Sequence, residues 1–210
     1  MKRIITVQHT RSQQHENGMI GSHMDWPLTE EGIRQAKKLG IRLAEELQNT
    51  ASVLYSSDLM RARQTAEPIA AGLGLTPCFT AALREFDLGE ASGRTKAWAK
   101  ENHCCPLWPG TIDWPEHADE MPFPGAESRQ DVWNRLSAFL DTLLSQSVET
   151  CILVSHSGTL SILFALWLGM YIHDTDHCLL AGKAGGVSEL LEDDAGHRIL
   201  VRLNDLSYIR

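Results

Sequence analysis

The 210-residue chain lacks several features that would assign it quickly to a class of protein. Its most apolar stretch, residues 160–170, is well short of the roughly 20 residues that cross a bilayer. The apolar run at residues 4–7 is too short for a secretion signal. Basic residues number 19 against 27 acidic ones, so no overall positive field attracts nucleic acid or an anionic membrane. We therefore expect a cytoplasmic protein without nucleic-acid or membrane partners.

Disulfide and zinc patterns are also missing. The five cysteines are an odd number, and no two of them are spaced as Cys-x-x-Cys. His103, Cys104 and Cys105 are consecutive, which does not resemble the usual spacing of zinc ligands. We expect reduced thiols and no metal site.

The expected strands and helices alternate along the chain, which is typical of a mostly parallel sheet with helices on both faces. Short apolar runs predict buried strands at residues 4–7, 53–55 and 151–154. Apolar residues three and four apart predict helices that begin after Thr29 and cover residues 132–144. The fold class is therefore α/β, a three-layer α/β/α arrangement with a mostly parallel central sheet.

Local signals set the expected limits of the first two helices. Ile33 begins the apolar face of the helix that follows Thr29. Ser57 or Asp58 is expected to cap the next helix, and Pro68 to kink or end it.

One segment departs from this alternation. It is rich in proline, contains Trp98, Trp108 and Trp114, and has no long periodic run. We expect a small, partly helical insert over the active site at about residues 85–127, within a single domain of residues 1–210. The tryptophans could line a pocket for the leaving group or pack in the core. Two apolar runs near the C-terminus predict a hairpin.

Two of the expected strands end at a histidine, His9 and His156. Ligands of open α/β sheets bind beyond the carboxyl ends of the strands, so the two histidines could form one site, although either alone could be structural. Arg61 lies in the first turn of a helix after a strand, where an anion can bind, but it could also be a solvated charge. Glu85 alone would be interpreted as a surface acid paired with Arg84.

Five segments that contain these residues resemble the histidine phosphatase, or phosphoglycerate mutase-like, superfamily, and they occur in the family's order. They are residues 7–10, 27–36, 55–67, 83–89 and 154–158, with a weaker match at 124–128. The third is the most specific and reads Tyr-Ser-Ser-Asp-Leu-Met-Arg-Ala-Arg-Gln-Thr-Ala-Glu. The length resembles the phosphatase branch more than the longer mutases.

The resemblance implies a metal-independent phosphomonoester hydrolase that needs no cofactor and acts on a small phosphorylated metabolite. His9 would be the nucleophile and would carry the phosphoryl group. His156 would bond the phosphoryl oxygens, and Arg61 would neutralise their charge. Glu85 would protonate the leaving alcohol and then activate water.

Three residues depart from the family pattern. Gln8 occupies the position of the family's arginine, Thr10 that of a glycine, and His15 that of an asparagine found in many members. His15 and Arg11 could replace part of the missing contact with phosphate. Because the loss of one transition-state donor costs on the order of 10²–10³ in rate, Gln8 is expected to reduce activity on generic monoesters.

Other functions stay open at this point. Gln8 favours a weakened, phospholigand-binding or regulatory protein of the same fold, and a mutase-type phosphotransferase is a further alternative. A serine hydrolase with Ser157 as nucleophile fits poorly, because Ser155 occupies the first glycine position of Gly-x-Ser-x-Gly. A homodimer is neither indicated nor excluded.

Overall fold

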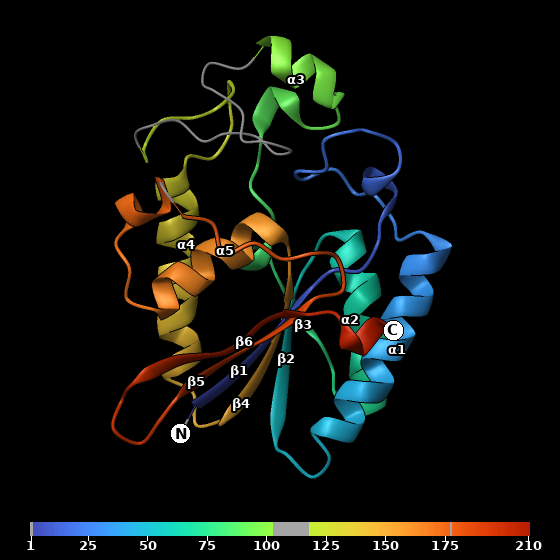
Figure 1. The fold of residues 1–210 in the computed structure, drawn as a ribbon, viewed down its shortest axis with the longest axis vertical. Coiled ribbons are helices and arrows are strands. Elements are labelled where there is room, and N and C mark those ends of the chain that lie inside the picture. The colour runs from blue at the N-terminus through green and yellow to red at the C-terminus, as the bar shows by residue number, and fades with distance from the viewer. Residues whose placement is uncertain (1, 103–117, 177) are drawn as a thin grey trace.

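The computed structural model describes residues 2–102, 118–176 and 178–210. Its centre is a six-stranded sheet with the strand order β3-β2-β4-β1-β5-β6 (Figure 1). The first four strands in that order are parallel, and β5 and β6 form an antiparallel hairpin on β1, which confirms the mostly parallel sheet and the terminal hairpin. The strands are β1 (Lys2–Gln8), β2 (Ser52–Ser57), β3 (Cys78–Thr80), β4 (Thr150–Ser155), β5 (Val187–Glu192) and β6 (Arg198–Asp205).

Helices cover both faces of the sheet and confirm the three-layer prediction. In Figure 1, α1 and α2 lie on one side of the strands and α4 and α5 on the other, while α3 lies above the strand ends. The α-helices are α1 (Glu30–Glu46), α2 (Met60–Leu73), α3 (Lys96–Asn102), α4 (Arg129–Leu144) and α5 (Ser157–Trp167). Short 3-10 helices are η1 (Gln13–His15), η2 (Ala81–Leu83), η3 (Gly89–Ala91), η4 (Ile172–Asp176) and η5 (Ser207–Ile209). None of the helices within the described ranges is long and apolar enough to cross a membrane.

The two central strands are buried on both faces, which explains their continuous apolar runs. Successive side chains of a strand point to opposite faces. Ile4 and Leu153 accordingly pack with the core beneath α4 and α5. Ile5 and Ile152 pack with the core beneath α1 and α2. Each core therefore lies between the sheet and one pair of helices.

The first helix begins where the sequence predicts, but its apolar face is set differently. The side chain of Thr29 accepts a hydrogen bond from the Gly32 backbone N–H at 3.1 Å. Ile33 is 42 % exposed, so its assignment to the buried face is wrong. Gly32 is buried instead. The carbonyl oxygen of Arg11 lies so close that a Cβ on residue 32 would be 1.9 Å from it. The loop after β1 thus packs directly on the helix backbone.

The cap of α2 comes from a distant loop. The residue before this helix is Leu59, which provides no side-chain cap, so neither Ser57 nor Asp58 caps it as expected. The Asp25 carboxylate accepts the hydrogen bond from the Met60 backbone N–H. Asp58 is engaged elsewhere, in a contact with Arg84 described below.

Pro68 does not end α2, because the helix continues to Leu73. It ends at Gly74, whose φ of +67° is the left-handed conformation typical of a helix C-terminus. At Pro68 the helix is packed tightly on α1, since a Cβ on Gly40 would lie 2.4 Å from the Pro68 carbonyl oxygen. Tertiary packing of this kind outweighs local propensity in protein helices.

The predicted insert contains α3 and η3 in its described part. Trp98 of α3 stacks on Phe123 with the ring centroids 6.1 Å apart and packs against the main core, which favours the core-packing interpretation for this tryptophan. Trp108, Trp114 and the His103-Cys104-Cys105 triplet lie outside the described residues. Cys78, Cys151 and Cys178 are free thiols.

Candidate active site

The sheet brings His9 and His156 together, as the sequence predicts. Strands β1 and β4 are parallel neighbours in which Gln8 is opposite Ser155. The His9 backbone N–H donates to the Ser155 carbonyl at 2.9 Å, and the two imidazole centroids are 5.1 Å apart. The centroid of the His15 ring is 5.5 Å from that of His9. His9 is therefore in contact with two other imidazoles.

The hydrogen bonding of His9 leaves its Nε2 lone pair available. Nδ1 lies 2.8 Å from the Thr10 carbonyl oxygen, and because a carbonyl only accepts, Nδ1 carries the proton. Burial lowers the pKa of His9 well below its usual value, with smaller contributions from Arg61 and His15. At neutral pH the ring is therefore uncharged, with a free nitrogen lone pair.

His156 is held by a hydroxyl group from β2. Its Nε2 lies 2.8 Å from Ser57 Oγ, which also accepts a hydrogen bond from the Leu59 backbone N–H. In the tautomer in which the Ser57 hydroxyl donates to Nε2, the proton of His156 is on Nδ1. That Nδ1 is buried and has no partner in the protein. Burial first, and then Arg61 and His9, lower the pKa of His156 well below its usual value.

His15 is a neutral donor in this arrangement. Its Nδ1 accepts a hydrogen bond from the Ser12 backbone N–H at 3.0 Å, so its proton is on Nε2. Burial lowers the pKa of His15, outweighing the opposite effect of the Ser12 contact. His15 therefore offers an N–H group and no charge at neutral pH.

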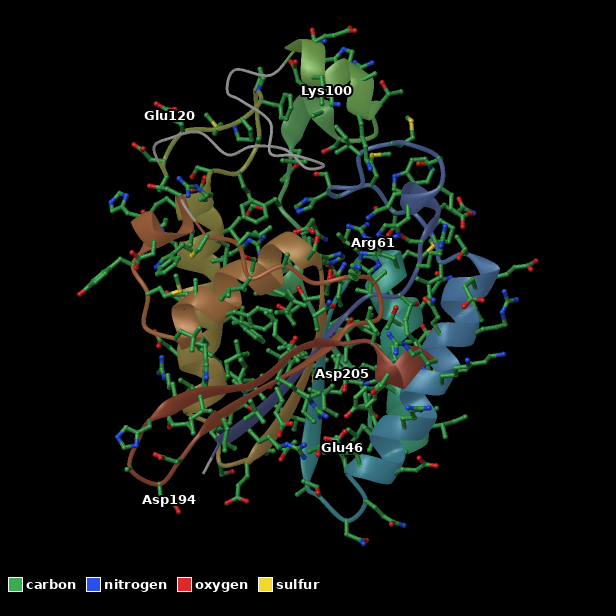
Figure 2. The ribbon with its side chains drawn as sticks, viewed as in Figure 1. Glu46, Arg61, Lys100, Glu120, Asp194 and Asp205 are labelled. Carbon is green, nitrogen blue, oxygen red and sulfur yellow. The ribbon has the colours of Figure 1, made fainter. Side chains whose placement is uncertain are left out.

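Arg61 supplies the fixed positive charge of the site. It lies at the end of α2 nearest the segment that carries α3, and its side chain is fully buried (Figure 2). Nη1 donates to the Met24 carbonyl at 2.8 Å and Nη2 to the Ser22 carbonyl at 2.7 Å, while Nε has no partner. Burial lowers the pKa of Arg61 to about 10, so the guanidinium stays charged at neutral pH.

Glu85 lies against the N-terminus of α5. Its carboxylate accepts hydrogen bonds from the backbone N–H groups of Gly158 at 3.2 Å and Thr159 at 3.1 Å. A Cβ on Gly158 would lie 2.8 Å from Glu85 Oε1, so this close approach requires glycine. Arg84 does not pair with Glu85, because it forms two hydrogen bonds with the Asp58 carboxylate at 2.7 and 2.6 Å. Glu85 therefore does not form the surface ion pair with Arg84 that the sequence suggested.

The remaining candidates differ in their surroundings. Gln8 is only 6 % exposed, and its Oε1 has no hydrogen-bond partner. Thr10 Oγ1 donates to the Gly32 carbonyl at 2.8 Å and so fixes the loop after His9 on α1. Arg11 is exposed and forms an ion pair with Glu16 at 2.9 Å.

Several residues that hold the site were missed by the sequence analysis. Ser57 was considered only as a helix cap, although it lies within the most specific of the matching segments. Ser22 and Met24 hold Arg61 through backbone carbonyls, which every residue possesses, so no sequence signal could have indicated them. His23 Nε2 lies 2.9 Å from the Glu85 carbonyl, and its Nδ1 is 3.4 Å from Asp87.

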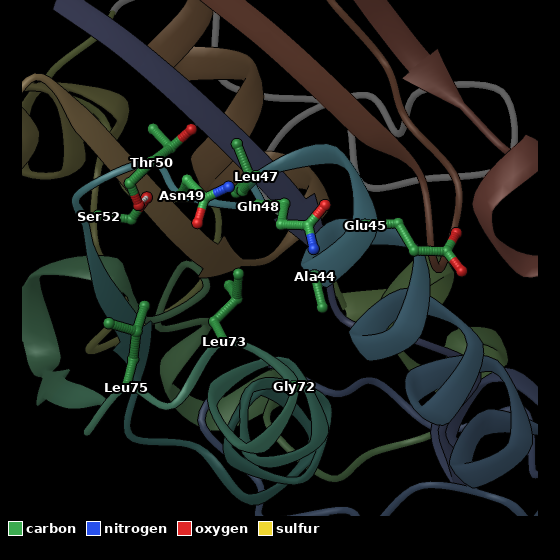
Figure 3. A pocket seen from close by; sticks show the side chains of 10 residues that line it. All are labelled: Ala44, Glu45, Leu47, Gln48, Asn49, Thr50, Ser52, Gly72, Leu73 and Leu75. Carbon is green, nitrogen blue, oxygen red and sulfur yellow. Dashed lines mark hydrogen bonds between the residues drawn. The ribbon is translucent and has the colours of Figure 1, made fainter.

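No group of three or more His, Cys, Asp or Glu side chains in the described ranges is arranged to hold a metal ion. A separate hollow of about 590 Å³ lies between the C-terminal ends of α1 and α2 and the start of β2 (Figure 3). Ala44, Leu47, Ser52 and Leu73 line it, and Glu45 is its one titratable residue. It adjoins the amino end of β2, whereas the histidines lie beyond the carboxyl ends of the strands. The hollow is therefore separate from the histidine cluster.

The histidine cluster can perform phosphoryl transfer. An uncharged His9 Nε2 can attack phosphorus, while the N–H group of His156 and the Arg61 guanidinium provide donors for phosphoryl oxygens. His156 Nδ1 and Arg61 Nε are among the buried polar atoms of the described residues that have no partner in the protein, so neither is engaged by another group.

Comparison with known proteins agrees with this chemistry. The sequence model of the histidine phosphatase superfamily (branch 1) matches residues 4–206. The chain is 35 % identical to "Probable phosphoglycerate mutase GpmB" of Citrobacter koseri, over 81 % of this chain and 76 % of that protein. It is 30 % identical to phosphoserine phosphatase 1 of Hydrogenobacter thermophilus, over 81 % and 78 % of the two chains.

The fold is also that of solved structures. A mycobacterial glucosyl-3-phosphoglycerate phosphatase in complex with VO3 superposes with a TM-score of 0.82 at 23 % identity, over 97 % of this chain and 99 % of the other. Because the family model covers nearly the whole sequence, the chain belongs to the histidine phosphatase superfamily, branch 1.

Proposed function

We propose that the protein is a phosphomonoester hydrolase that acts on a small phosphorylated metabolite through a phosphohistidine on His9. The observation that carries this proposal is the His9 Nε2 lone pair, freed by the contact of Nδ1 with the Thr10 carbonyl and flanked by His156. Relatives named as phosphatases support the hydrolytic reaction.

The reaction would proceed in two balanced steps. His9 Nε2 forms a bond to phosphorus as the bond to the leaving oxygen breaks, and Glu85 gives that oxygen a proton. Water then attacks the phosphohistidine, Glu85 takes a proton from it, and phosphate leaves with His9 restored. Arg61 and the Nδ1–H group of His156 stabilise the phosphoryl oxygens in both steps.

The position of Glu85 supports its role as the proton donor and acceptor. Two N–H groups at the start of α5, from Gly158 and Thr159, hold its carboxylate, and α5 begins directly after His156. The carboxylate is therefore fixed relative to the imidazole that would bind the phosphoryl group. Proton transfer needs such fixed positions, because the donor must be within hydrogen-bond reach of the leaving oxygen.

The test is release of p-nitrophenol from p-nitrophenyl phosphate by the purified protein. His9→Ala is expected to reduce the rate to background, whereas His197→Ala is a matched control, because His197 is exposed and pairs with Asp193 in the β5–β6 hairpin. Mass spectrometry of the rapidly quenched protein should find one added phosphoryl group on His9. Turnover that survives in His9→Ala would contradict the proposal.

A binding or regulatory role is the alternative that Gln8 favours, since one arginine contact with phosphate is absent. Vanadate or phosphate binding without any p-nitrophenol release would support that alternative. The likeness to proteins named as mutases calls for a parallel assay of phosphoryl exchange between phosphoglycerate isomers.

A further inference from the structure

The loop between β1 and α1 contacts both Arg61 and the segment that carries Glu85. On one side, the carbonyls of Ser22 and Met24 accept hydrogen bonds from the two Nη groups of Arg61, at 2.7 and 2.8 Å. On the other side, His23 Nε2 lies 2.9 Å from the Glu85 carbonyl oxygen, and because a carbonyl only accepts, the imidazole donates. One short stretch of backbone therefore links the cation of the site to the segment of its carboxylate.

The Ser22 hydroxyl group provides further contacts between this loop and the Glu85 segment. It donates to the Phe86 carbonyl at 3.0 Å, and it accepts from the Leu88 backbone N–H and from the Ser92 hydroxyl, each at 2.7 Å. A hydroxyl group has one donor and two acceptor sites, so all three are used. The residue is only 3 % exposed, which shields these contacts from water.

The backbone of Ser22 has a conformation that serine rarely adopts. Its φ is +44°, in the left-handed region. The other non-glycine residues with positive φ in the described ranges are Asn49 and Asn204, and asparagine enters this region more readily than most residues. Glycine would fit the same φ more easily but has no hydroxyl group. The three contacts of the hydroxyl group give a physical reason for a serine at this position.

The Glu85 segment is anchored from other elements, whereas Arg61 depends on the loop. The start of α5 holds the Glu85 carboxylate, and Arg135 of α4 donates to the carbonyls of Ala82 and Arg84 at 2.7 and 3.0 Å. Both Nη groups of Arg61 bind the loop, and its Nε has no partner among the described residues. Burial lowers the pKa of Arg61, and Glu85 opposes this effect, so the two groups also interact electrostatically.

We propose that Ser22 is a positioning residue that fixes the Arg61 guanidinium relative to Glu85. Its carbonyl holds Arg61, and its hydroxyl group attaches the same residue to the backbone that follows Glu85. In the proposed reaction, Arg61 contacts the phosphoryl oxygens while Glu85 protonates the leaving oxygen, so the two groups need a fixed separation. The consequence for turnover rests on the proposed function, whereas the positioning of Arg61 does not.

NMR of the arginine side chains tests the positioning without turnover. Rotation averages the Nη proton signals of a free guanidinium, whereas two carbonyl contacts should give Arg61 separate signals, assigned by their absence from Arg61→Lys. Ser22→Ala and Ser22→Gly keep the carbonyl but detach it from the Glu85 segment, so the signals should broaden or merge. Ser92→Ala is the matched control, because it removes only a contact with Ser22 Oγ, and it should leave the signals separate. Averaged signals in the parent protein, or unchanged signals in either Ser22 variant, would overturn the proposal.

Turnover and stability together distinguish positioning from a merely structural role. In both Ser22 variants, kcat for p-nitrophenyl phosphate should fall by roughly 10-fold to 100-fold, because the catalytic groups are misaligned. Ser22→Ala should unfold at a lower urea concentration than Ser22→Gly, because alanine is strained at this positive φ. A merely structural role would make kcat follow stability.

An unchanged kcat in Ser22→Ala, or a kcat that recovers with stability in Ser22→Gly, would overturn the proposal. A parent protein without turnover, in which the Arg61 signals respond to both Ser22 variants as expected, would support the positioning of Arg61 and contradict only the proposed function.

Discussion

Acid should destabilise this protein through its buried histidines. His9 and His156 are 2 % and 0 % exposed, and burial lowers both pKa values well below the usual value. In the unfolded chain the same rings have a pKa of about 6.5. As the pH falls, the unfolded state therefore binds protons before the folded state does. The stability is complete above about pH 6.5 and decreases below it.

The size of the effect follows from the number of rings. Below about pH 6.5, each ring that stays neutral in the folded state lowers the unfolding free energy by about 1.4 kcal/mol per pH unit. His9 and His156 alone predict a slope of about 2.7 kcal/mol per pH unit between about pH 6 and pH 5, before most carboxylates titrate, and the lowered pKa of His15 adds to it in the same direction. Domains of this kind have total stabilities of about 5–15 kcal/mol, so the loss is easily measured.

Urea unfolding followed by circular dichroism, from about pH 7.5 to about pH 5, measures this slope in buffers free of phosphate. His9→Gln should remove the proton difference of one ring and reduce the slope by about 1.4 kcal/mol per pH unit. His197→Gln is the matched control, because this side chain is 75 % exposed, and it should leave the slope unchanged. A flat profile in the parent protein, or an undiminished slope in His9→Gln, would refute the reasoning.

Three further perturbations test how the site is held. Ser57→Ala removes the hydroxyl that contacts His156 Nε2, so kcat should fall by roughly 10-fold or more. Ser57→Thr should restore kcat, and the control Ser56→Ala should change kcat little. Equal effects of the two alanine variants would contradict this role of Ser57. Gly158→Ala forces a methyl group toward Glu85, so the free energy of unfolding measured in urea should fall by about 1–3 kcal/mol and most of the turnover should be lost. Unchanged kinetics would show that the contact between Gly158 and Glu85 is not needed. Gln8→Arg should raise turnover of p-nitrophenyl phosphate above about pH 7, where the substrate is a dianion, and a rate no higher than that of the parent would indicate that another group already supplies the charge.

The central part of the fold and the histidine pair could be predicted because both depend on local patterns. Residues 4–7 and 151–154 are continuous apolar runs, and such runs form strands that are buried on both faces. Parallel strands present their carboxyl ends at one edge, so a histidine after each run places His9 beside His156. Short-range sequence rules were sufficient for this result.

The supports of the site could not be predicted, because they act over long sequence separations and through the backbone. The cap of α2 comes from Asp25, and two carbonyls of the same loop hold Arg61. Neither contact requires a particular local pattern at the partner residue. Glu85 was ambiguous for a related reason, since its neighbour Arg84 pairs with Asp58, which is 26 residues away. The pairing of charges thus had to come from the structure.

An acidic chain can still bind an anion, because the charges on its surface and the charge of Arg61 act in different surroundings. A net charge of −8 acts from a solvated surface, where salt screens it over about 8–10 Å. Arg61 acts from inside the protein, where screening is weak and the surrounding donors are fixed. A family arginine at position 8 would add a second buried cation and favour doubly charged phosphoryl groups. With glutamine there, the site keeps His9, His156 and Arg61 but has one buried cation fewer than the family pattern.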